Sequence, residues 1–235
     1  MTTPLKRVLV TGGGTGIGLA TVRRLIERGT EVIAIGRRIE RLEDAHRRGA
    51  DIISHDVRSS PDLLLQQTGP IDGLILNAGI QERQSISEWS EDAWHTLFDV
   101  NLFASVRLIQ AFVAQLEGSG SIVGISSTLA VRPAPGTGAY AASKAALIAL
   151  LQNVALEGAI QGLRANTVLP GIVDTEMVAC DDPEHREALN QLHPIGRLGQ
   201  PAEIAEVVVG VLENPWLTGA SIPIDGGLLL GTAPT

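Results

Sequence analysis

The chain has 235 residues, of which 44% are hydrophobic and 19% charged, a composition that is ordinary for a globular protein and suits one large α/β domain. The net charge of −8 and the pI near 5.1 argue against a general surface for nucleic acid or anionic membranes, which requires clustered Lys and Arg. The single cysteine, Cys180, excludes an internal disulfide, and the N-terminal segment has no signal-peptide core, so we expect a reducing, cytoplasmic location.

Short apolar runs bounded by turn residues predict seven buried strands, because such runs are typical of a parallel sheet. They cover Arg7–Thr11, Glu31–Ile35, Asp51–His55, Gly73–Leu76, Ser121–Ile125, Arg164–Leu169 and Ala220–Ile224. Apolar spacing of about 3.6 residues predicts helices over Ile17–Arg28, Ile39–Arg48, Ser59–Gln67, Glu91–Leu116, Tyr140–Ala159 and Pro201–Leu212. This alternation predicts a parallel sheet with helices on both faces.

No repeat, low-complexity tract or Pro/Gly linker divides the sequence, so we expect one compact unit over residues 1–235. The stretch Glu176–Leu198 has no clear strand pattern and contains Pro183 and Pro194. We interpret it as a mobile flap over the binding site.

The first predicted strand leads directly into TGGGTGIG, Thr11–Gly18, and then into a helical pattern. In this context Gly12 permits a tight turn, Gly16 allows the backbone to approach a pyrophosphate, and Gly18 lets the helix pack on the strand. The free N–H groups at the start of the helix, near Thr15 and Ile17, would bind the phosphates. The spacing G-x-x-x-G-x-G of these glycines differs from the common fingerprint G-x-G-x-x-G, so a purely structural turn remains an alternative.

The end of the second strand reads Gly36, Arg37, Arg38. An acidic residue there would bind the ribose 2′-hydroxyl of NAD, whereas two arginines suit a 2′-phosphate. We therefore predict NADP(H), with NAD(H) as the alternative. The arginines that follow, Arg41, Arg47 and Arg48, are better explained as part of a solvent-exposed helix face that also carries acidic residues.

Tyr140 and Lys144 stand four residues apart in AYAASKAALIAL, a helical segment, and so share one helix face. A free tyrosine, with a pKa of about 10, cannot act as a base near neutral pH unless a neighbouring cation stabilises its phenolate. A tyrosine and a lysine at this spacing often occur by chance, so the pair alone does not indicate a catalytic site. However, Tyr140 is the only tyrosine in the chain, and it follows Ser127, which comes after an apolar strand, by thirteen residues.

Together with Asn77-Ala78-Gly79, these motifs resemble the short-chain dehydrogenase/reductase family, in its short form, from Lys6 to Gly227. The resemblance implies a single doubly wound Rossmann domain, with a cofactor half over about residues 1–115 and a catalytic half over about 116–235. It also implies hydride transfer between a nicotinamide and a carbonyl or secondary alcohol. A non-catalytic NADP(H) sensor and a related lyase or isomerase are the alternatives.

By that resemblance Ser127 would hydrogen-bond the substrate oxygen, with Ser126 as the alternative serine. Tyr140 would pass the proton, and Lys144 would also hold the nicotinamide ribose. Asn101 would hold a water that links Lys144 to solvent; alternatively its side chain bends toward a backbone carbonyl within its helix.

The resemblance also implies the remaining cofactor contacts. Asp56, followed by Val57, would contact the adenine, although a turn or cap carboxylate is an equal alternative. The segment Asn77, Ala78 and Gly79 would close over the adenosine. The nicotinamide carboxamide would be held by the segment that contains Pro170, Gly171, Ile172 and Thr175.

Other features predict partners and exclusions. The five histidines show no pair at metal-ligand spacing with a carboxylate or thiolate, so we expect no metal site. The helix after Tyr140 is apolar on nearly every side, which predicts a subunit contact. The family resemblance implies that this contact forms a homodimer or homotetramer. Substrate specificity would lie in Glu176–Leu198 and in the loops after Ile80 and Thr128, and the sequence names no particular carbonyl or alcohol.

Overall fold

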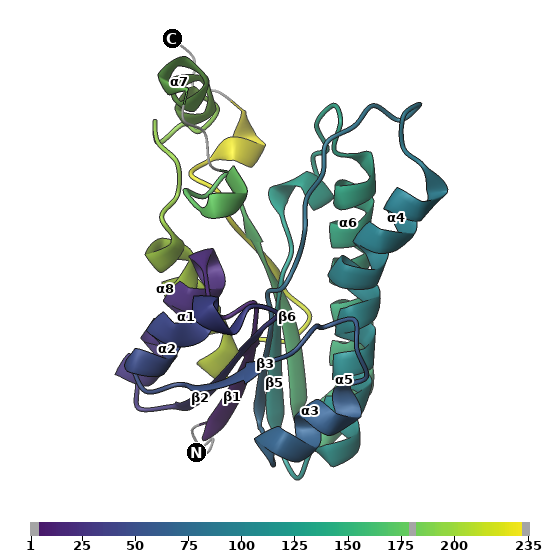
Figure 1. Ribbon diagram of the computed structural model, residues 1–235, viewed down its shortest axis with the longest axis vertical. Coiled ribbons are helices and arrows are strands. Elements are labelled where there is room, and N and C mark those ends of the chain that lie inside the picture. The colour runs from purple at the N-terminus through teal and green to yellow at the C-terminus, as the bar shows by residue number, and fades with distance from the viewer. Residues whose placement is uncertain (1–4, 179–181, 232–235) are drawn as a thin grey trace.

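The protein is a seven-stranded parallel sheet with helices on both faces, seen in a computed structural model that describes residues 5–178 and 182–231 (Figure 1). The strand order is β3-β2-β1-β4-β5-β6-β7. The strands are β1 Arg7–Thr11, β2 Glu31–Gly36, β3 Asp51–Ser54, β4 Gly73–Leu76, β5 Gly120–Ile125, β6 Leu163–Pro170 and β7 Ser221–Ile224. The predicted fold class is therefore confirmed. The strand order reverses between β1 and β4, which is where open α/β sheets form a ligand crevice.

The helices cover the sheet in two layers. On one face α1 (Gly16–Glu27), α2 (Ile39–Arg47) and α8 (Pro201–Glu213) pack on alternate strand residues such as Val8 and Val10. On the other face α3 (Pro61–Thr68), α5 (Ala104–Gln115) and α6 (Gly138–Gly158) pack on the intervening residues. The outlying helices are α4 (Glu91–Phe98) and α7 (Pro183–Gln191). Because the strands are buried on both faces, they read as continuous apolar runs.

Two stretches differ from the prediction. The single helix expected over 91–116 is divided into α4, a π-helical turn at Asp99–Phe103, and α5. A π-helical turn has poorer geometry than an α-helix and occurs frequently at functional sites. The expected flap contains α7, which begins with Pro183 and is capped by Asp182 at the N–H of Glu184. Few apolar residues mark α7, so its periodicity is weak, and Cys180 lies outside the described residues.

Helix α6 is apolar on most of its surface because several elements cover it. Leu147 and Leu151 pack against the sheet, and α4 and the π-helical turn lie beside the helix (Figure 1). Leu156 and Ile160, near its end, are 80% and 94% exposed. The stretches 91–115 and 138–161 are long and apolar enough to cross a membrane by length and composition alone, a test that core helices of this kind also pass.

Candidate active site

The glycine turn between β1 and α1 is closed so tightly that side chains do not fit. Gly12 and Gly16 have φ values of +64° and +50°, a left-handed backbone that favours glycine. A Cβ on Gly18 would overlap the carbonyl oxygen of Gly12 and lie 2.5 Å from Nδ2 of Asn77. The turn therefore brings backbone N–H groups and the start of α1 to the crevice, a cradle that fits the pyrophosphate of a dinucleotide.

A small hydrogen-bond network fixes this turn to the end of β4. The hydroxyl of Thr11, which is 2% exposed, donates to Ile75 O and accepts from the backbone N–H groups of Asn77 and Ala78, both at 2.9 Å. Nδ2 of Asn77 donates to the carbonyls of Thr11 and Gly12 at 3.0 and 3.2 Å. The structure thus gives Asn77 a structural role in shaping the cradle.

The adenosine side of the crevice is a small hollow that includes Gly36, Arg37, Arg38, Asp56 and Val57 among its lining residues. Both oxygens of Asp56 accept hydrogen bonds from the Arg58 guanidinium, the shortest at 2.7 Å, and Oδ1 also accepts from the backbone N–H of Arg58. These bonds hold the pKa of Asp56 at about 2. Its carboxylate closes a turn with Arg58, and its contact with the adenine stays a prediction.

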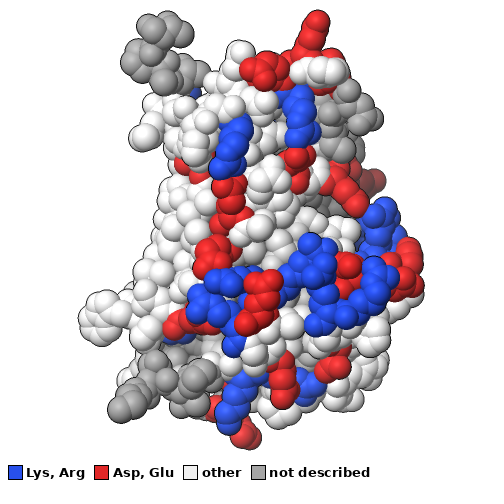
Figure 2. Space-filling model, turned by 90° about the vertical axis from the view of Figure 1, so that its left-hand side faces the viewer, with Lys and Arg blue, Asp and Glu red and all other residues white. Residues whose placement is uncertain are grey.

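The basic stretch of α2 separates into two groups. Arg47 and Arg48 pair with Asp44, and Figure 2, which views the face of α1, α2 and α8, shows basic and acidic side chains interleaved. Arg41 pairs at 2.7 Å with Glu176, far along the chain. In the parts of the chain that the structure describes, Arg37 and Arg38 have no carboxylate at ion-pair distance.

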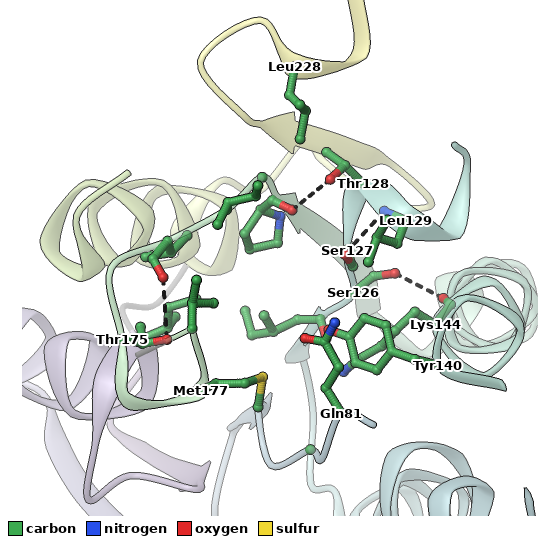
Figure 3. Close-up of a pocket in the computed structure, with 18 of the residues that line it drawn as sticks. Gln81, Ser126, Ser127, Thr128, Leu129, Tyr140, Lys144, Thr175, Met177 and Leu228 are labelled. Atoms are coloured by element: carbon green, nitrogen blue, oxygen red, sulfur yellow. Dashed lines mark hydrogen bonds between the residues drawn. The ribbon is translucent and has the colours of Figure 1, made fainter. Parts of the chain in front are cut away.

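A cavity of about 970 Å³ runs from the glycine turn past the ends of β4, β5 and β6. Ser127, Tyr140 and Lys144 all line it (Figure 3). The Nζ of Lys144 lies 5.7 Å from the centre of the Tyr140 ring and donates to Ile125 O at 2.8 Å. One cavity therefore joins the glycine cradle to a phenol and an amine.

Burial sets the acidity of both groups. It raises the pKa of Tyr140 to about 12, opposed by the nearby Ser127 hydroxyl, and it lowers the pKa of Lys144 to about 8. The sequence suggested that the ammonium would make the phenol more acidic. Within the protein alone desolvation dominates instead, because both side chains are almost fully removed from water.

The two neighbouring serines point in different directions (Figure 3). The Ser126 hydroxyl donates to Lys144 O in α6 at 2.9 Å. The Ser127 oxygen accepts from the N–H of Leu129 at 3.1 Å and lies close enough to the Tyr140 phenol to lower its pKa. Of the two, Ser127 is the one beside the phenol.

Asn101 sits in the π-helical turn and is 1% exposed. Its Oδ1 accepts from the N–H of Ile80 at 2.8 Å, and its Nδ2 donates to Ile80 O and to the Ser143 hydroxyl. A Cβ on Gly79 would lie 3.3 Å from both Asn101 Oδ1 and Lys144 Nζ, so both side chains reach the backbone at Gly79. The carbonyl that Asn101 binds belongs to another segment, contrary to the expected alternative of a bond within its own helix. Its proposed link between Lys144 and solvent stays a prediction.

The segment after β6 closes the cavity from the other side. Pro170, Gly171, Ile172 and Thr175 line it, and a Cβ on Gly16 would lie 3.1 Å from Cγ2 of Thr175. The N–H of Ile172 donates to Nε2 of His193 at 3.3 Å, and Nδ1 of His193 lies 3.0 Å from Leu189 O. No sequence pattern marks His193, since it has neither metal-ligand spacing nor a neighbouring acid.

Comparison with known proteins identifies a family whose members match nearly the whole chain. Residues 6–185 match the family model described as short chain dehydrogenase. A 3-oxoacyl-[acyl-carrier-protein] reductase of Thermotoga maritima is 32% identical over 96% of this chain and 98% of its own. An L-xylulose reductase of Mus musculus is 32% identical over 95% and 96%. A solved short-chain dehydrogenase/reductase variant of Serratia marcescens superposes with a TM-score of 0.88 at 32% identity, over 95% of this chain and 98% of that one.

Proposed function

The chain belongs to the short-chain dehydrogenase family and is an NAD(P)-dependent oxidoreductase that acts on keto or hydroxyl groups; we propose that its cofactor is NADP(H) and that Tyr140 passes the proton. One observation carries this proposal. Ser127, Tyr140 and Lys144 line the cavity that the glycine cradle opens into, with the Ser127 hydroxyl close enough to the phenol to lower its pKa and the amine beside the ring.

The proposed reaction uses these residues in fixed roles. The bound dinucleotide supplies or accepts the hydride. The Ser127 hydroxyl hydrogen-bonds the substrate oxygen, and Tyr140 donates its proton to that oxygen as negative charge develops on it. Because burial keeps the phenol protonated at neutral pH, it is ready to act as the acid in the direction of carbonyl reduction. Lys144, held by Ile125 O, would bind the nicotinamide ribose, and Asn101 would order a water beside it.

The charge at the end of β2 supports NADP(H). No acid stands at Gly36, and Asp56 is occupied by Arg58. Arg37 and Arg38 face the hollow without a carboxylate partner among the described residues, and Arg37 lies close enough to contribute to the lowered pKa of Asp56. Two guanidinium groups without acidic partners at this position suit a 2′-phosphate, which accepts charge-assisted hydrogen bonds.

The residues that line the crevice suggest the remaining contacts with the cofactor. The pyrophosphate would lie on the N–H groups of the turn at Thr15, Gly16 and Ile17. The backbone of Ile172 and the hydroxyl of Thr175 would hold the carboxamide. Ala78 and Gly79 would cover the adenosine side.

The proposal is tested by following NADPH oxidation across classes of ketone, with the wild type beside Tyr140→Phe. The phenylalanine variant should lose at least about 100-fold in kcat, the range that a general acid supplies, while binding NADPH normally by fluorescence titration. Trp216→Phe, a change at a 95% exposed aromatic residue, is the control and should keep full activity. Retention of more than a tenth of kcat by Tyr140→Phe would refute the role. Turnover of a substrate without net NADPH consumption would favour a lyase or isomerase.

We also propose a homodimer or homotetramer in the cytoplasm. The exposed side chains of Leu156, in the last turn of α6, and Ile160, just after it, support self-association, because exposed apolar side chains favour an interface. Sedimentation at micromolar concentration tests this, with a double substitution of these residues by Glu expected to shift the protein toward monomer.

A further inference from the structure

We propose that the carbonyl substrate carries an anionic group, a carboxylate or a phosphate, which Arg83 and Arg132 bind at the mouth of the active-site cavity. The inference rests on the proposed function, and it adds the chemical class of the substrate. Both arginines line the same cavity as Ser127 and Tyr140.

The two arginines lie in different loops that contact each other. Arg83 lies in the loop after β4, and Arg132 follows the short helical turn Thr128–Ala130 after β5. The N–H of Gln84 donates to Gly136 O at 3.0 Å, and a Cβ on Gly136 would lie 3.8 Å from Cβ of Arg83. These contacts join the two loops, and both arginines line the one cavity.

Each guanidinium has donors left for a ligand. Arg132 donates from one nitrogen to Leu228 O at 3.0 Å, and Leu228 itself lines the cavity (Figure 3). A guanidinium has five N–H donors, so that bond orients the group and leaves the others available. Arg83 makes no hydrogen bond or ion pair with any residue that the structure describes.

This lack of acidic partners is unusual in the chain. Most arginines of the described residues lie within ion-pair distance of a carboxylate. The exceptions are Arg37, Arg38, Arg83, Arg132 and Arg164. Arg164 donates to backbone carbonyls instead. The other four are two pairs: one pair faces the hollow proposed for the 2′-phosphate, and the other faces the substrate cavity.

The charge of the cavity wall agrees with this assignment. Although the chain carries a net charge of −8, Glu176 is the one acid among the described lining residues, and Arg41 neutralises it at 2.7 Å. An anion that enters therefore meets two guanidinium groups and no unpaired carboxylate from the described lining. Arginine binds carboxylates and phosphates through paired, charge-assisted hydrogen bonds.

Beside polar residues such as Gln81 and His185, the cavity lining has a set of large apolar side chains that suit the carbon chain of a ligand. The residues are Leu129, Met177, Leu189, Leu192, Leu228 and Leu229. A ligand with its carbonyl at Tyr140 and its anionic group at the arginines would place its middle part against these side chains. The expected substrate is therefore a keto compound in which apolar carbons separate the carbonyl from a terminal anion.

The test compares matched substrate pairs with NADPH. Levulinate and its next two longer homologues are each measured against their methyl esters, and hydroxyacetone phosphate is measured against hydroxyacetone. In the best pair the anion should be favoured at least about tenfold in kcat/KM, as expected for a hydrogen bond to a charged group. The carboxylate and phosphate arms identify which anion the site prefers.

The variants Arg83→Gln, Arg132→Gln and their combination should remove the preference step by step. The double variant should treat acid and ester alike, mainly through a higher KM for the acid, while activity on the ester is unchanged. Arg28→Gln is the control, since it removes the same charge from a surface residue near Glu206 and Glu213, outside the lining of the cavity. The control should keep the preference for the acid.

A binding measurement separates failure of this inference from failure of the proposed function. The NADPH complex of Tyr140→Phe is titrated with each acid and its ester, followed by cofactor fluorescence, so that no turnover is required. Tighter binding of the anion that the double variant loses supports the anion site even if turnover is slow. Equal binding of acid and ester, or a preference that survives in the double variant, overturns it, whether or not neutral ketones are reduced.

Discussion

The Nζ of Lys144 lies 5.7 Å from the centre of the Tyr140 ring, and burial drives both groups toward their uncharged forms. The pKa of the phenol rises to about 12 and that of the amine falls to about 8. The protein therefore holds a protonated phenol beside an amine that can lose its proton close to neutral pH.

The phenol of Tyr140 should titrate far above the value of a free tyrosine in the protein alone. Because it is the only tyrosine in the chain, the near-ultraviolet absorbance of tyrosinate reports on it directly. We expect an apparent pKa of about 12 without nucleotide. Saturating NADP⁺ should lower this pKa by about 1–3 units, because a nearby positive charge favours the phenolate. A titration near pH 10 that NADP⁺ does not move contradicts this account.

Replacing Lys144 by Met should make stability depend differently on pH. The amine has a pKa of about 8 in the folded protein against 10.5 as its ordinary value. Between these values the unfolded chain binds the extra proton, so the free energy of unfolding of the wild type should rise with pH in this window relative to Lys144→Met. The relative gain should be on the order of 3 kcal/mol. Urea unfolding of both proteins at pH 7 and pH 10 measures it, and a constant difference would show that burial does not control the amine.

A methyl group at Gly18 should damage the cofactor site. Its Cβ would overlap Gly12 O, so Gly18→Ala should reduce stability by about 1–3 kcal/mol and weaken NADPH binding. Gly210→Ala is the matched control, because both glycines lie in helices and a Cβ on Gly210 meets nothing within 4 Å. The control should gain up to about 1 kcal/mol from helix propensity. Denaturant unfolding and NADPH titration distinguish the two, and equal behaviour would rule out the steric argument.

Arg37→Asp should shift cofactor preference toward NAD(H). The new carboxylate would repel a 2′-phosphate and accept a hydrogen bond from a ribose hydroxyl. We expect the ratio of kcat/KM for NADPH to that for NADH to fall by at least about tenfold, as for a charged hydrogen bond. Arg48→Asp changes the same charge on the far end of α2, beside Asp44, and should leave the ratio unaltered. An unchanged ratio in Arg37→Asp would refute the assignment of NADP(H).

Local sequence patterns were sufficient to predict the strands of the sheet and the positions of its main motifs. Each predicted strand agrees with the observed one to within one residue at either end, since aliphatic runs between turn residues directly reflect burial on both faces. The glycine turn and the shared helix face of Tyr140 and Lys144 are also properties of neighbouring residues, and they needed no knowledge of distant segments.

The tertiary structure alone decided what depends on contacts between distant segments. It placed Asn101 in a π-helical turn against Ile80, joined His193 to Ile172, and brought Arg83 and Arg132 to the lining of one cavity. It also determined that the Tyr140 phenol becomes less acidic. Desolvation and charge pairing depend on every group packed around a side chain, and these groups come from loops and strands whose separation along the chain bears no relation to their separation in space.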